Sequence, residues 1–321
     1  MDNKLHIARS CLRCSILGGS SDLPSYFNEH GGLVIGFAIN QYAYVTCRRT
    51  PNIFDYKTSI HYSKTERVLS NQDLKHDGAR GVLEYLGDNA GYDLGCLMSL
   101  PARTGTGSSS AFVVAMLKVL WTMKGVPHDR HLLAKTANYI ERILLKEAGG
   151  WQDAVFAAYG NFNVIRFEHN DFKVYPINVN VQPLLDRMVL LYTGQARMSF
   201  ELAESYENPD TIGRKHAIKS LAEAGLLAVE NSDWDTLAAL MNQGWLEKRG
   251  ISSKVSNSHV DDIYQRGMSQ GAVAAKLLGS GGSGFMLFIL EEGADREEFT
   301  EKMGLCRVEF EVDYKGASIV L

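Results

Sequence analysis

The chain has 321 residues, enough for about two domains or one large one. Hydrophobic residues make up 45% and charged residues 22%, which excludes a disordered, collagenous or coiled-coil chain. The 37 acidic and 33 basic residues give a net charge of −4, so no overall positive field attracts nucleic acid or anionic lipid. No apolar run reaches the roughly 20 residues that cross a bilayer, and the start lacks the apolar stretch of a signal peptide. We therefore expect a cytoplasmic protein without a nucleic-acid or membrane partner, while its oligomeric state stays open.

The first 65 residues are rich in strand-forming residues, above all between positions 33 and 49. After a polar stretch, the hydrophobic pattern predicts helices at 77–87, 107–124 and 128–147 and strands at 92–99, 161–168 and 171–178. A strand at 187–193 opens the second half, and helices follow, the last of them ending at Leu278. The final elements are a strand, a helix and a strand at 284–290, 295–303 and 306–312. Because strands and helices do not alternate regularly, we predict an α+β fold, with domains of residues 1–180 and 181–321.

Five cysteines, an odd number, do not indicate a disulfide framework. Cys11 and Cys14 form a CxxC pair, but no second pair supplies the remaining ligands of a zinc site. The alternating apolar residues around them predict a strand, in which positions 11 and 14 face opposite sides. Metal or redox chemistry is therefore not expected at this pair.

A loop rich in glycine and serine, Pro101-Ala-Arg-Thr-Gly-Thr-Gly-Ser-Ser-Ser-Ala111, leads directly into an apolar helix. Gly105 and Gly107 let the backbone approach an anion, and the serines and free N–H groups of the helix start donate hydrogen bonds to it. We interpret the loop as a site for nucleotide phosphates, the alternative being a helix cap with spare serines. The predicted nucleotide-binding residues are Pro101, Arg103, Thr104, Gly105, Thr106, Gly107, Ser108, Ser109 and Ser110.

Two further glycine-rich loops occur, and no GxxxxGK[ST] P-loop does. Gly279-Ser-Gly-Gly-Ser-Gly284 fits the pattern GxGxxG, but a Rossmann fingerprint follows a strand and opens a helix, whereas here we expect a helix before the loop and a strand after it. It is either a flexible loop or a backbone segment that closes over an active site through Gly281 and Gly282. Gly18-Gly-Ser-Ser-Asp22 is either a turn or another part of that site.

Ser10-Cys-Leu-Arg13 and the loops at 101–111 and 276–285 together resemble the three ordered motifs of the GHMP kinases, the superfamily of galactokinase, homoserine kinase, mevalonate kinase and phosphomevalonate kinase. Within it, the segments 18–27, 31–34, 39–42 and 256–264 look most like the sugar kinases that phosphorylate D-glycero-D-manno-heptose 7-phosphate. The resemblance implies an N-terminal half like domain 2 of ribosomal protein S5, a ferredoxin-like C-terminal half and an ATP site between them. The chain departs from the family pattern at Cys11, Ser20, Arg103 and Thr106.

The resemblance also implies the catalytic groups. Asp153, in the segment GGWQD, matches the catalytic aspartate, and Arg13 would lower the pKa of the acceptor hydroxyl beside it. From the residues alone, Asp153 could equally be a helix N-terminal charge. Glu141 matches the Mg²⁺-binding glutamate, with Ser109 or Ser110 as its companion ligand. On its apolar helix face this carboxylate is costly to ionise unless it is paired, bound to metal or directed to solvent.

Six residues are candidates for the substrate pocket: Gly281 and Gly282 of the last loop, and Asp22, Tyr26, Gln152 and Arg197. Asp22 would accept hydrogen bonds from sugar hydroxyls, unless it only forms a turn. Tyr26 and Gln152 are further candidates for the same pocket. Arg197 either binds the phosphate of the substrate or is a solvated loop arginine.

Together these features imply a sugar 1-kinase that uses Mg²⁺ and ATP to convert a heptose 7-phosphate to the 1,7-bisphosphate. One alternative is a 1-kinase of an unphosphorylated sugar such as fucose, and another is a sugar or nucleotide sensor without catalysis on the same fold. A mevalonate-type kinase is disfavoured because the first loop continues as Asp22-Leu-Pro-Ser-Tyr26 instead of the His-Ala-Val of that branch.

Overall fold

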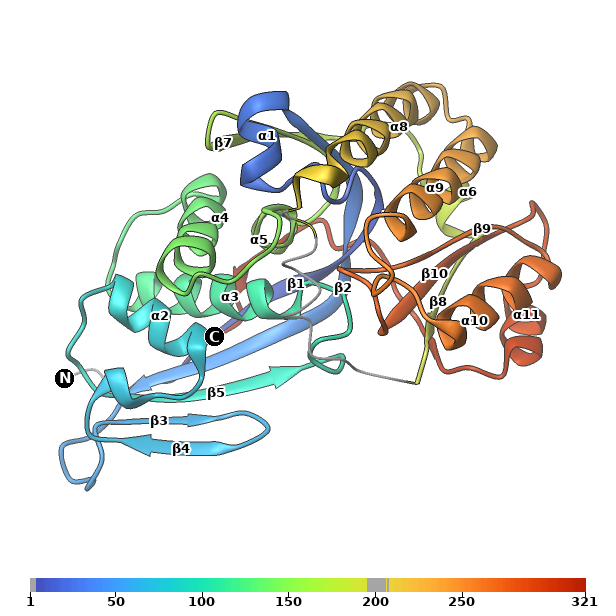
Figure 1. Ribbon diagram of the computed structural model, residues 1–321. Helices are drawn as coiled ribbons and strands as arrows, with labels where there is room; N and C mark the ends of the chain where they lie inside the picture. The colour runs from blue at the N-terminus through green and yellow to red at the C-terminus, as the bar shows by residue number, and fades with distance from the viewer. Residues whose placement is uncertain (1–3, 195–205, 207) are drawn as a thin grey trace.

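The computed structural model describes residues 4–194, 206 and 208–321, which fold into two β-sheets with helices packed around them (Figure 1). Among these residues, no helix combines the length and the apolar character that a membrane span requires. The strands are β1 His6–Leu17, β2 Gly32–Arg49, β3 Thr58–His61, β4 Thr65–Val68, β5 Tyr92–Met98, β6 Phe162–Glu168, β7 Asp171–Pro176, β8 Met188–Tyr192, β9 Ala272–Leu277, β10 Phe285–Leu290, β11 Arg307–Val308 and β12 Ser318–Ile319. The helices are α1 Pro24–His30, α2 Asp77–Tyr85, α3 Ser108–Met123, α4 Arg130–Tyr139, α5 Gln152–Tyr159, α6 Gln182–Leu185, α8 Ile212–Glu230, α9 Trp234–Arg249, α10 Ser258–Ser269 and α11 Arg296–Met303.

The long strand β2 is the spine of the first sheet, whose order is β12-β1-β2-β5-β3-β4. It pairs with β1 along most of its length, with β6 through residues 32–37 and with β5 through residues 43–49. The strand β7 pairs with β6 and extends the sheet further. In β1, a register shift between Cys11 and Leu12 marks a bulge, a feature that changes the direction of the strand and of the side chains beside it. Arg13 follows this bulge.

The helices α3 and α5 pack against β1 and β2, and α4 packs on α5 (Figure 1). The helix α3 is apolar on nearly all sides because it lies between the sheet and the helices α2, α4 and α5. One hydrophobic core joins the two halves of the chain, since it contains Leu12 of β1, Val113 of α3 and Leu287 of β10. The loop before α3 is therefore attached to a rigid, fully packed helix.

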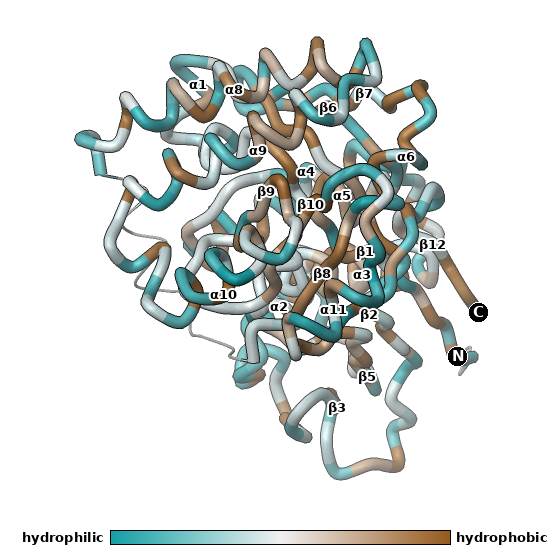
Figure 2. Tube along the Cα trace, turned by 90° about the vertical axis from the view of Figure 1, so that its right-hand side faces the viewer, coloured by the Kyte–Doolittle hydropathy of each residue, from teal (hydrophilic) through white to brown (hydrophobic). Residues whose placement is uncertain are grey.

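The second sheet has the order β11-β8-β10-β9, and every residue of β10 is buried. The hydrophobic strands β8 and β10 are brown in Figure 2. The helices α9 and α10 pack against β9, α8 also contacts β1 and β2, and α9 also contacts β1. These two sheets with their unevenly spaced helices confirm the α+β prediction.

The predicted helix ending at Leu278 is wrong in its last part, because residues 272–277 form the strand β9. Ala274 and Ala275 favour helices as isolated residues, but here the segment pairs with β10, with Leu277 opposite Met286. The helices α9 and α10 pack on β9, and all but one of its residues are buried, so the sequence shows no alternation of apolar and polar residues. The loop 279–284 therefore joins two strands and opens no helix.

The end of the chain also differs from expectation. The predicted strand 306–312 is reduced to β11, and the chain then returns to the first sheet, where β12 pairs with β1. A bridge between Val312 and Ile39 of β2 precedes that pairing. Along the chain, β7 is in the first sheet and β8 in the second. The domain division at residue 180 stays a prediction. The short helix α1, which begins at Pro24, was not expected.

Candidate active site

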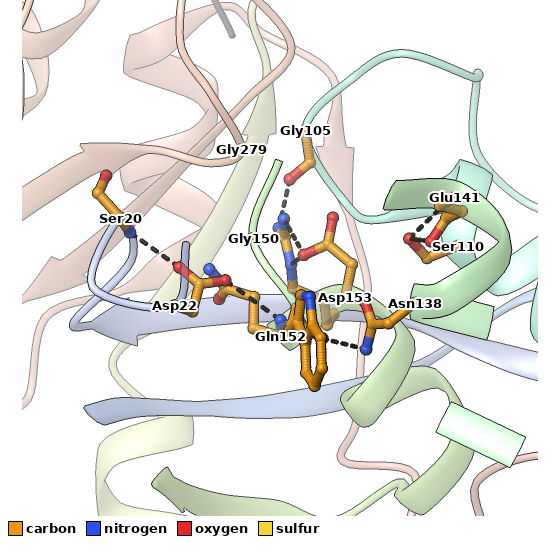
Figure 3. Close-up of polar contacts among 12 residues, drawn as sticks. Ser20, Asp22, Gly105, Ser110, Asn138, Glu141, Gly150, Gln152, Asp153 and Gly279 are labelled. Atoms are coloured by element: carbon orange, nitrogen blue, oxygen red, sulfur yellow. Dashed lines mark hydrogen bonds and ion pairs between the residues drawn. The ribbon is translucent and has the colours of Figure 1, made fainter. Parts of the chain in front are cut away.

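A cleft of about 250 Å³ lies where the three glycine-rich loops meet. Its lining includes Arg13, Asp22, Gly107, Glu141, Asp153 and Ser280, which come from both halves of the chain. Figure 3 shows how Asp22, Asp153 and Glu141 surround this space. The fold thus gathers into one place motifs that are far apart in the sequence.

The loop before α3 needs glycine at two positions. Gly107 is the N-cap of α3 with φ 77°, and a Cβ there would lie 3.3 Å from the Cβ and Cγ atoms of Asp153. Gly105 has φ 81°, and a Cβ there would collide with the carbonyl oxygen of Leu278. Because only glycine combines a positive φ with so small a volume, the loop can pass between Asp153 and the β9–β10 loop.

The predicted nucleotide-binding residues fall into two groups. Those that line the cleft are Arg103, Gly105, Gly107, Ser108, Ser109 and Ser110. Thr104 and Thr106 are buried and hold the loop in place: Thr104 O accepts from the Phe285 N–H at 3.2 Å, and Thr106 O from the Arg13 N–H at 3.0 Å. Pro101 is exposed, and its carbonyl oxygen accepts from the Thr104 hydroxyl at 2.6 Å. These three residues are not part of the lining.

Arg13 and Asp153 form a partly buried ion pair at the cleft. The Nε and Nη2 atoms of Arg13 lie 2.9 and 2.8 Å from Oδ1 of Asp153, and Nη1 donates to the carbonyl oxygen of Gly105. The Arg13 side chain is 5% exposed and that of Asp153 is 24% exposed. Since both contacts end on Oδ1, Oδ2 of Asp153 retains its capacity to accept a proton from a hydroxyl in the cleft. Asp153 also stands in the first turn of α5, so both interpretations of this residue apply.

Glu141 lies in a π-helical turn, Ile140–Leu144, that continues α4, and it is 1% exposed. The hydroxyl of Ser110 donates to its carboxylate, with distances of 3.0 Å to Oε1 and 2.7 Å to Oε2. Burial raises the pKa of Glu141 to about 7, although the nearby guanidinium of Arg142 lowers it. The carboxylate therefore does not extend into solvent, and it lacks enough positive charge around it to hold its ordinary pKa.

The donor set at Glu141 fits Mg²⁺. A carboxylate and a hydroxyl are hard oxygen ligands, and Mg²⁺ takes one or two protein oxygens while phosphates and water complete its coordination. A cation would also offset the burial that raises the pKa of Glu141. Ser110 is the serine in contact with Glu141, whereas Ser109 is exposed.

Asp22 connects the first loop with the start of α5 (Figure 3). Its Oδ1 accepts from the Ser20 N–H at 2.9 Å and its Oδ2 from the Gln152 N–H at 3.1 Å. The side chain is buried, and burial raises its pKa. Ser20 has φ 92°, a value that glycine adopts readily, which accounts for the glycine usual at this place in the family. Asp22 forms the turn and also faces the cleft, where each carboxylate oxygen can accept a further hydrogen bond.

The other substrate candidates differ in position. Gln152 lines the cleft, and its buried Oε1 has no hydrogen-bond partner among the described residues. Gly281 lines the cleft, whereas Gly282 does not and donates to the carbonyl oxygen of Val255 at 2.9 Å. Tyr26 is buried away from the lining, and its hydroxyl lies 2.7 Å from Nδ1 of His216. Arg197 lies outside the described residues.

Sequence reasoning missed two buried lysines near the cleft. Lys248 of α9 donates to the carbonyl oxygen of Gly279, and Lys276 of β9 donates to that of Ile16 at 2.8 Å. Burial lowers the pKa of both ammonium groups. Lys248 lies between Glu247 and Arg249, a pattern typical of an exposed helix, so the sequence does not indicate that it is buried. Lys276 stands among apolar residues of a strand, which was a signal that the helix prediction hid.

Comparison with known families agrees with this geometry. Residues 76–161 match the family described as GHMP kinases N terminal domain, and residues 220–304 match the one described as GHMP kinases C terminal. The first match contains the loop before α3, Glu141 and Asp153, and the second contains Lys248 and the β9–β10 loop. The two matches thus include two of the three glycine-rich loops that meet at the cleft, whereas Arg13 and the loop at 18–22 precede them.

Individual relatives cover nearly the whole chain. The D-glycero-alpha-D-manno-heptose 7-phosphate kinase of Campylobacter jejuni is 29% identical over 87% of this chain and 88% of its own length. The bifunctional fucokinase/GDP-fucose pyrophosphorylase of Arabidopsis thaliana is 23% identical over 97% of this chain, which corresponds to 32% of that protein. The crystal structure of a D-glycero-D-manno-heptose 1-phosphate kinase from Bacteroides thetaiotaomicron superposes with a TM-score of 0.79, at 26% identity and 98% coverage of both chains.

Proposed function

The chain belongs to the GHMP kinase superfamily, phosphotransferases that act on hydroxyl groups, and we propose that it is an ATP-dependent 1-kinase of D-glycero-D-manno-heptose 7-phosphate. The single observation that carries the proposal is the Arg13–Asp153 pair, which stands at the start of α3 with Asp22 and Gln152 in the same cleft. The names of the Campylobacter relative and of the Bacteroides structure support a heptose derivative as the acceptor.

In the proposed reaction, the γ-phosphoryl group of ATP moves to the oxygen of the sugar 1-hydroxyl. The bond from the γ-phosphorus to the β,γ-bridging oxygen breaks, the bond to the sugar oxygen forms, and ADP leaves. The hydroxyl proton passes to Oδ2 of Asp153. Arg13 keeps Asp153 oriented through Oδ1 and offsets negative charge that develops on the sugar oxygen.

The remaining residues bind and orient. The N–H groups at the start of α3 and the hydroxyls of Ser108 and Ser109 are placed to donate to the phosphates of ATP. Glu141 and Ser110 would hold Mg²⁺, which neutralises phosphate charge when bound. Asp22 accepts from sugar hydroxyls through both carboxylate oxygens, and the buried Oε1 of Gln152 offers a further acceptor.

Two rival functions make different demands on the cleft. A 1-kinase of an unphosphorylated sugar would use the same Asp153 and Glu141, and the fucokinase named above supports it as the second candidate. A sensor without catalysis would not need an oriented carboxylate beside the phosphate loop, so the Arg13–Asp153 contacts argue against it.

A panel of acceptors with Mg²⁺ and ATP tests the proposal. ADP release would be measured with heptose 7-phosphate, the free heptose, L-fucose and mevalonate. We expect kcat/KM for heptose 7-phosphate to exceed that of free heptose by about 10-fold or more, the worth of one or two hydrogen bonds to a charged group. Equal turnover of the two heptoses would favour the free-sugar kinase, and ADP release that no acceptor stimulates would contradict a sugar kinase.

A further inference from the structure

Lys248 lies in the last turn of α9 and contacts the β9–β10 loop. Its side chain is buried, and its ammonium group donates to the carbonyl oxygen of Gly279. A second group, the hydroxyl of Tyr206, donates to the carbonyl oxygen of Ser280, the next residue along the loop. Two side chains outside the three family motifs thus donate hydrogen bonds to carbonyl oxygens of the β9–β10 loop.

Gly279 in turn packs on the nucleotide loop. A Cβ on Gly279 would collide with Cα of Gly105, so the two backbones are in direct contact. The carbonyl oxygen of Gly105 accepts from Nη1 of Arg13, and Arg13 holds Asp153 through its other two nitrogens. We call the series Lys248, Gly279, Gly105 and Arg13 the Lys248 contact chain. It leads without a gap from a helix of the second half to the carboxylate proposed as the base.

The charge on Lys248 is costly where it stands. Burial and, to a smaller extent, the charge of Arg13 lower its pKa to about 8, although Asp22 and Asp153 act in the opposite direction. The C-terminal end of α9 stabilises a cation to a small extent. An apolar side chain would fill the same space without this penalty. The ammonium group therefore supplies a hydrogen bond that an apolar side chain cannot make, and it donates this bond to the β9–β10 loop at the cleft.

We propose that Lys248 is a positioning residue for phosphoryl transfer: it presses the β9–β10 loop onto the nucleotide loop and so sets the place of the Arg13–Asp153 pair. The inference rests on the proposed kinase function. It assigns a role to α9, which contributes no residue to the lining of the cleft. Because displacement of a reacting group by about 1 Å can slow a reaction by about 100-fold, a loosened contact chain would be visible in kcat.

The kinetic test compares two lysines that make the same kind of bond. Lys219 of α8 donates to the carbonyl oxygen of His30 at 2.6 Å, away from the cleft, so Lys219→Met is the matched control. We expect Lys248→Met to lower kcat by about 10- to 100-fold with KM for ATP changed by less than about threefold, and Lys248→Arg to recover part of kcat. Lys219→Met should retain wild-type kcat. Wild-type kcat in Lys248→Met, or an equal loss in Lys219→Met, would overturn the proposal.

Hydrogen exchange tests the contact chain without turnover. In Lys248→Met, amide exchange in residues 103–108 and 279–284 should speed up together by about 10-fold or more, as expected when a local structure loses an anchoring bond. Lys219→Met should leave both segments as in the wild type. If Lys248→Met does not fold, Lys248→Gln replaces it in both assays. Unchanged exchange in residues 103–108 would overturn the inference, whereas absence of turnover in the wild type alone would count against the kinase function only.

Discussion

Among single residues, the proposed phosphoryl transfer depends most on Asp153, whose two carboxylate oxygens have different tasks. Oδ1 of Asp153 is bound twice by Arg13, whereas Oδ2 receives no hydrogen bond from the described residues, and Asp153 lines the cleft. A base needs this asymmetry, because one oxygen fixes the orientation and the other takes the proton. Arg13 itself is fixed through Gly105, so the loop proposed to bind phosphate also positions the carboxylate proposed as the base.

Replacement of Asp153 by asparagine keeps the shape of the side chain and an oxygen for Arg13, but removes the group that takes the proton. We expect Asp153→Asn to lower kcat by roughly 10²- to 10⁴-fold. The affinity for ATP, measured by calorimetry without acceptor, should change little because Asp153 does not contact the phosphates in this account. Wild-type kcat in this variant would assign the base to another residue.

Lys248 gives a pH dependence of stability whose sign follows from its pKa, about 8 in the folded chain against an ordinary 10.5. Below pH 8 the folded and unfolded chains both carry the proton, and the cost of the buried charge is present in full. Between pH 8 and 10.5 only the unfolded chain retains the proton, so the free energy of unfolding rises with pH, by on the order of 3 kcal/mol.

Urea unfolding of the wild type and of Lys248→Met across this pH range measures the effect. Since other groups titrate in both proteins, the informative quantity is the difference between the two free energies of unfolding. That difference should shift in favour of the wild type as the pH rises from 8 to 10.5. A difference that is independent of pH would mean that Lys248 keeps an ordinary pKa.

At the scale of elements, the decisive unit is the loop that leads into α3. The helix is anchored by buried residues along its whole length, so its first turn has a fixed position. Gly107 caps it in the left-handed conformation and leaves the N–H groups of the first turn open to an anion. A side chain at this position would press on Asp153, because its Cβ would lie 3.3 Å from the Cβ and Cγ atoms of that residue.

Gly125, at the other end of α3, offers a matched control for Gly107. Both glycines have positive φ, 65° and 77°, but nothing lies within 4 Å of a Cβ placed on Gly125. Gly107→Val and Gly125→Val should therefore bear similar backbone strain, of about 1–3 kcal/mol. Only Gly107→Val should abolish the rise in Tm that ATP and Mg²⁺ produce by binding the folded state. A folded Gly107→Val protein with the full ATP-induced rise would contradict the assignment of the loop.

The sequence predicted those helices and strands in which the distribution of apolar residues alone indicates the secondary structure. The helix at 107–124 and the strand at 33–49 were predicted closely because apolar residues fill them continuously and glycine or polar residues flank them. The strand β9 was not, because a strand covered on both faces resembles a buried helix when it is short and rich in alanine. The helix α1 has only 7 residues, which is too short to show a helical pattern of apolar residues.

In the candidate site, too, some residues could be predicted and others could not. The resemblance to a family identified Asp153, Arg13, Glu141 and Asp22, and the fold brings all four to one cleft. Lys248 was missed because nothing in a run of charged residues tells which one folds inward. Tyr26 was included because it follows the first loop, but α1 turns its side chain toward His216 and away from the cleft.

At the scale of the whole molecule, the end of the chain joins the two halves. After the second sheet is complete, residues 311–321 return to β1 and β2, the strands that carry Arg13 and its neighbours. Asp313 is the centre of this return. Its Oδ2 accepts from the Tyr42 hydroxyl at 2.6 Å, and its Oδ1 from the N–H groups of Lys315 and Gly316 at 2.8 and 2.7 Å.

Removal of this carboxylate should destabilise the whole chain. Asp313→Ala leaves these three donors without their acceptor, the buried N–H of Gly316 among them, and we expect the free energy of unfolding in urea to fall by about 2–4 kcal/mol. Tyr42→Phe removes one of these bonds and should cost about 1–2 kcal/mol. If Asp313→Ala unfolds within about 0.5 kcal/mol of the wild type, as ordinary surface substitutions do, the return of the chain is not a stabilising element.

The central claim is that this cleft transfers a phosphoryl group to the 1-hydroxyl of a heptose 7-phosphate. The most direct measurement is ³¹P NMR of the product formed from ATP, Mg²⁺ and heptose 7-phosphate labelled with ¹³C at carbon 1. The account predicts a second sugar phosphate signal split by coupling to the labelled carbon, formed by the wild type and nearly absent with Asp153→Asn. A product whose new phosphate is not coupled to carbon 1, or the same product at the same rate from Asp153→Asn, would contradict it.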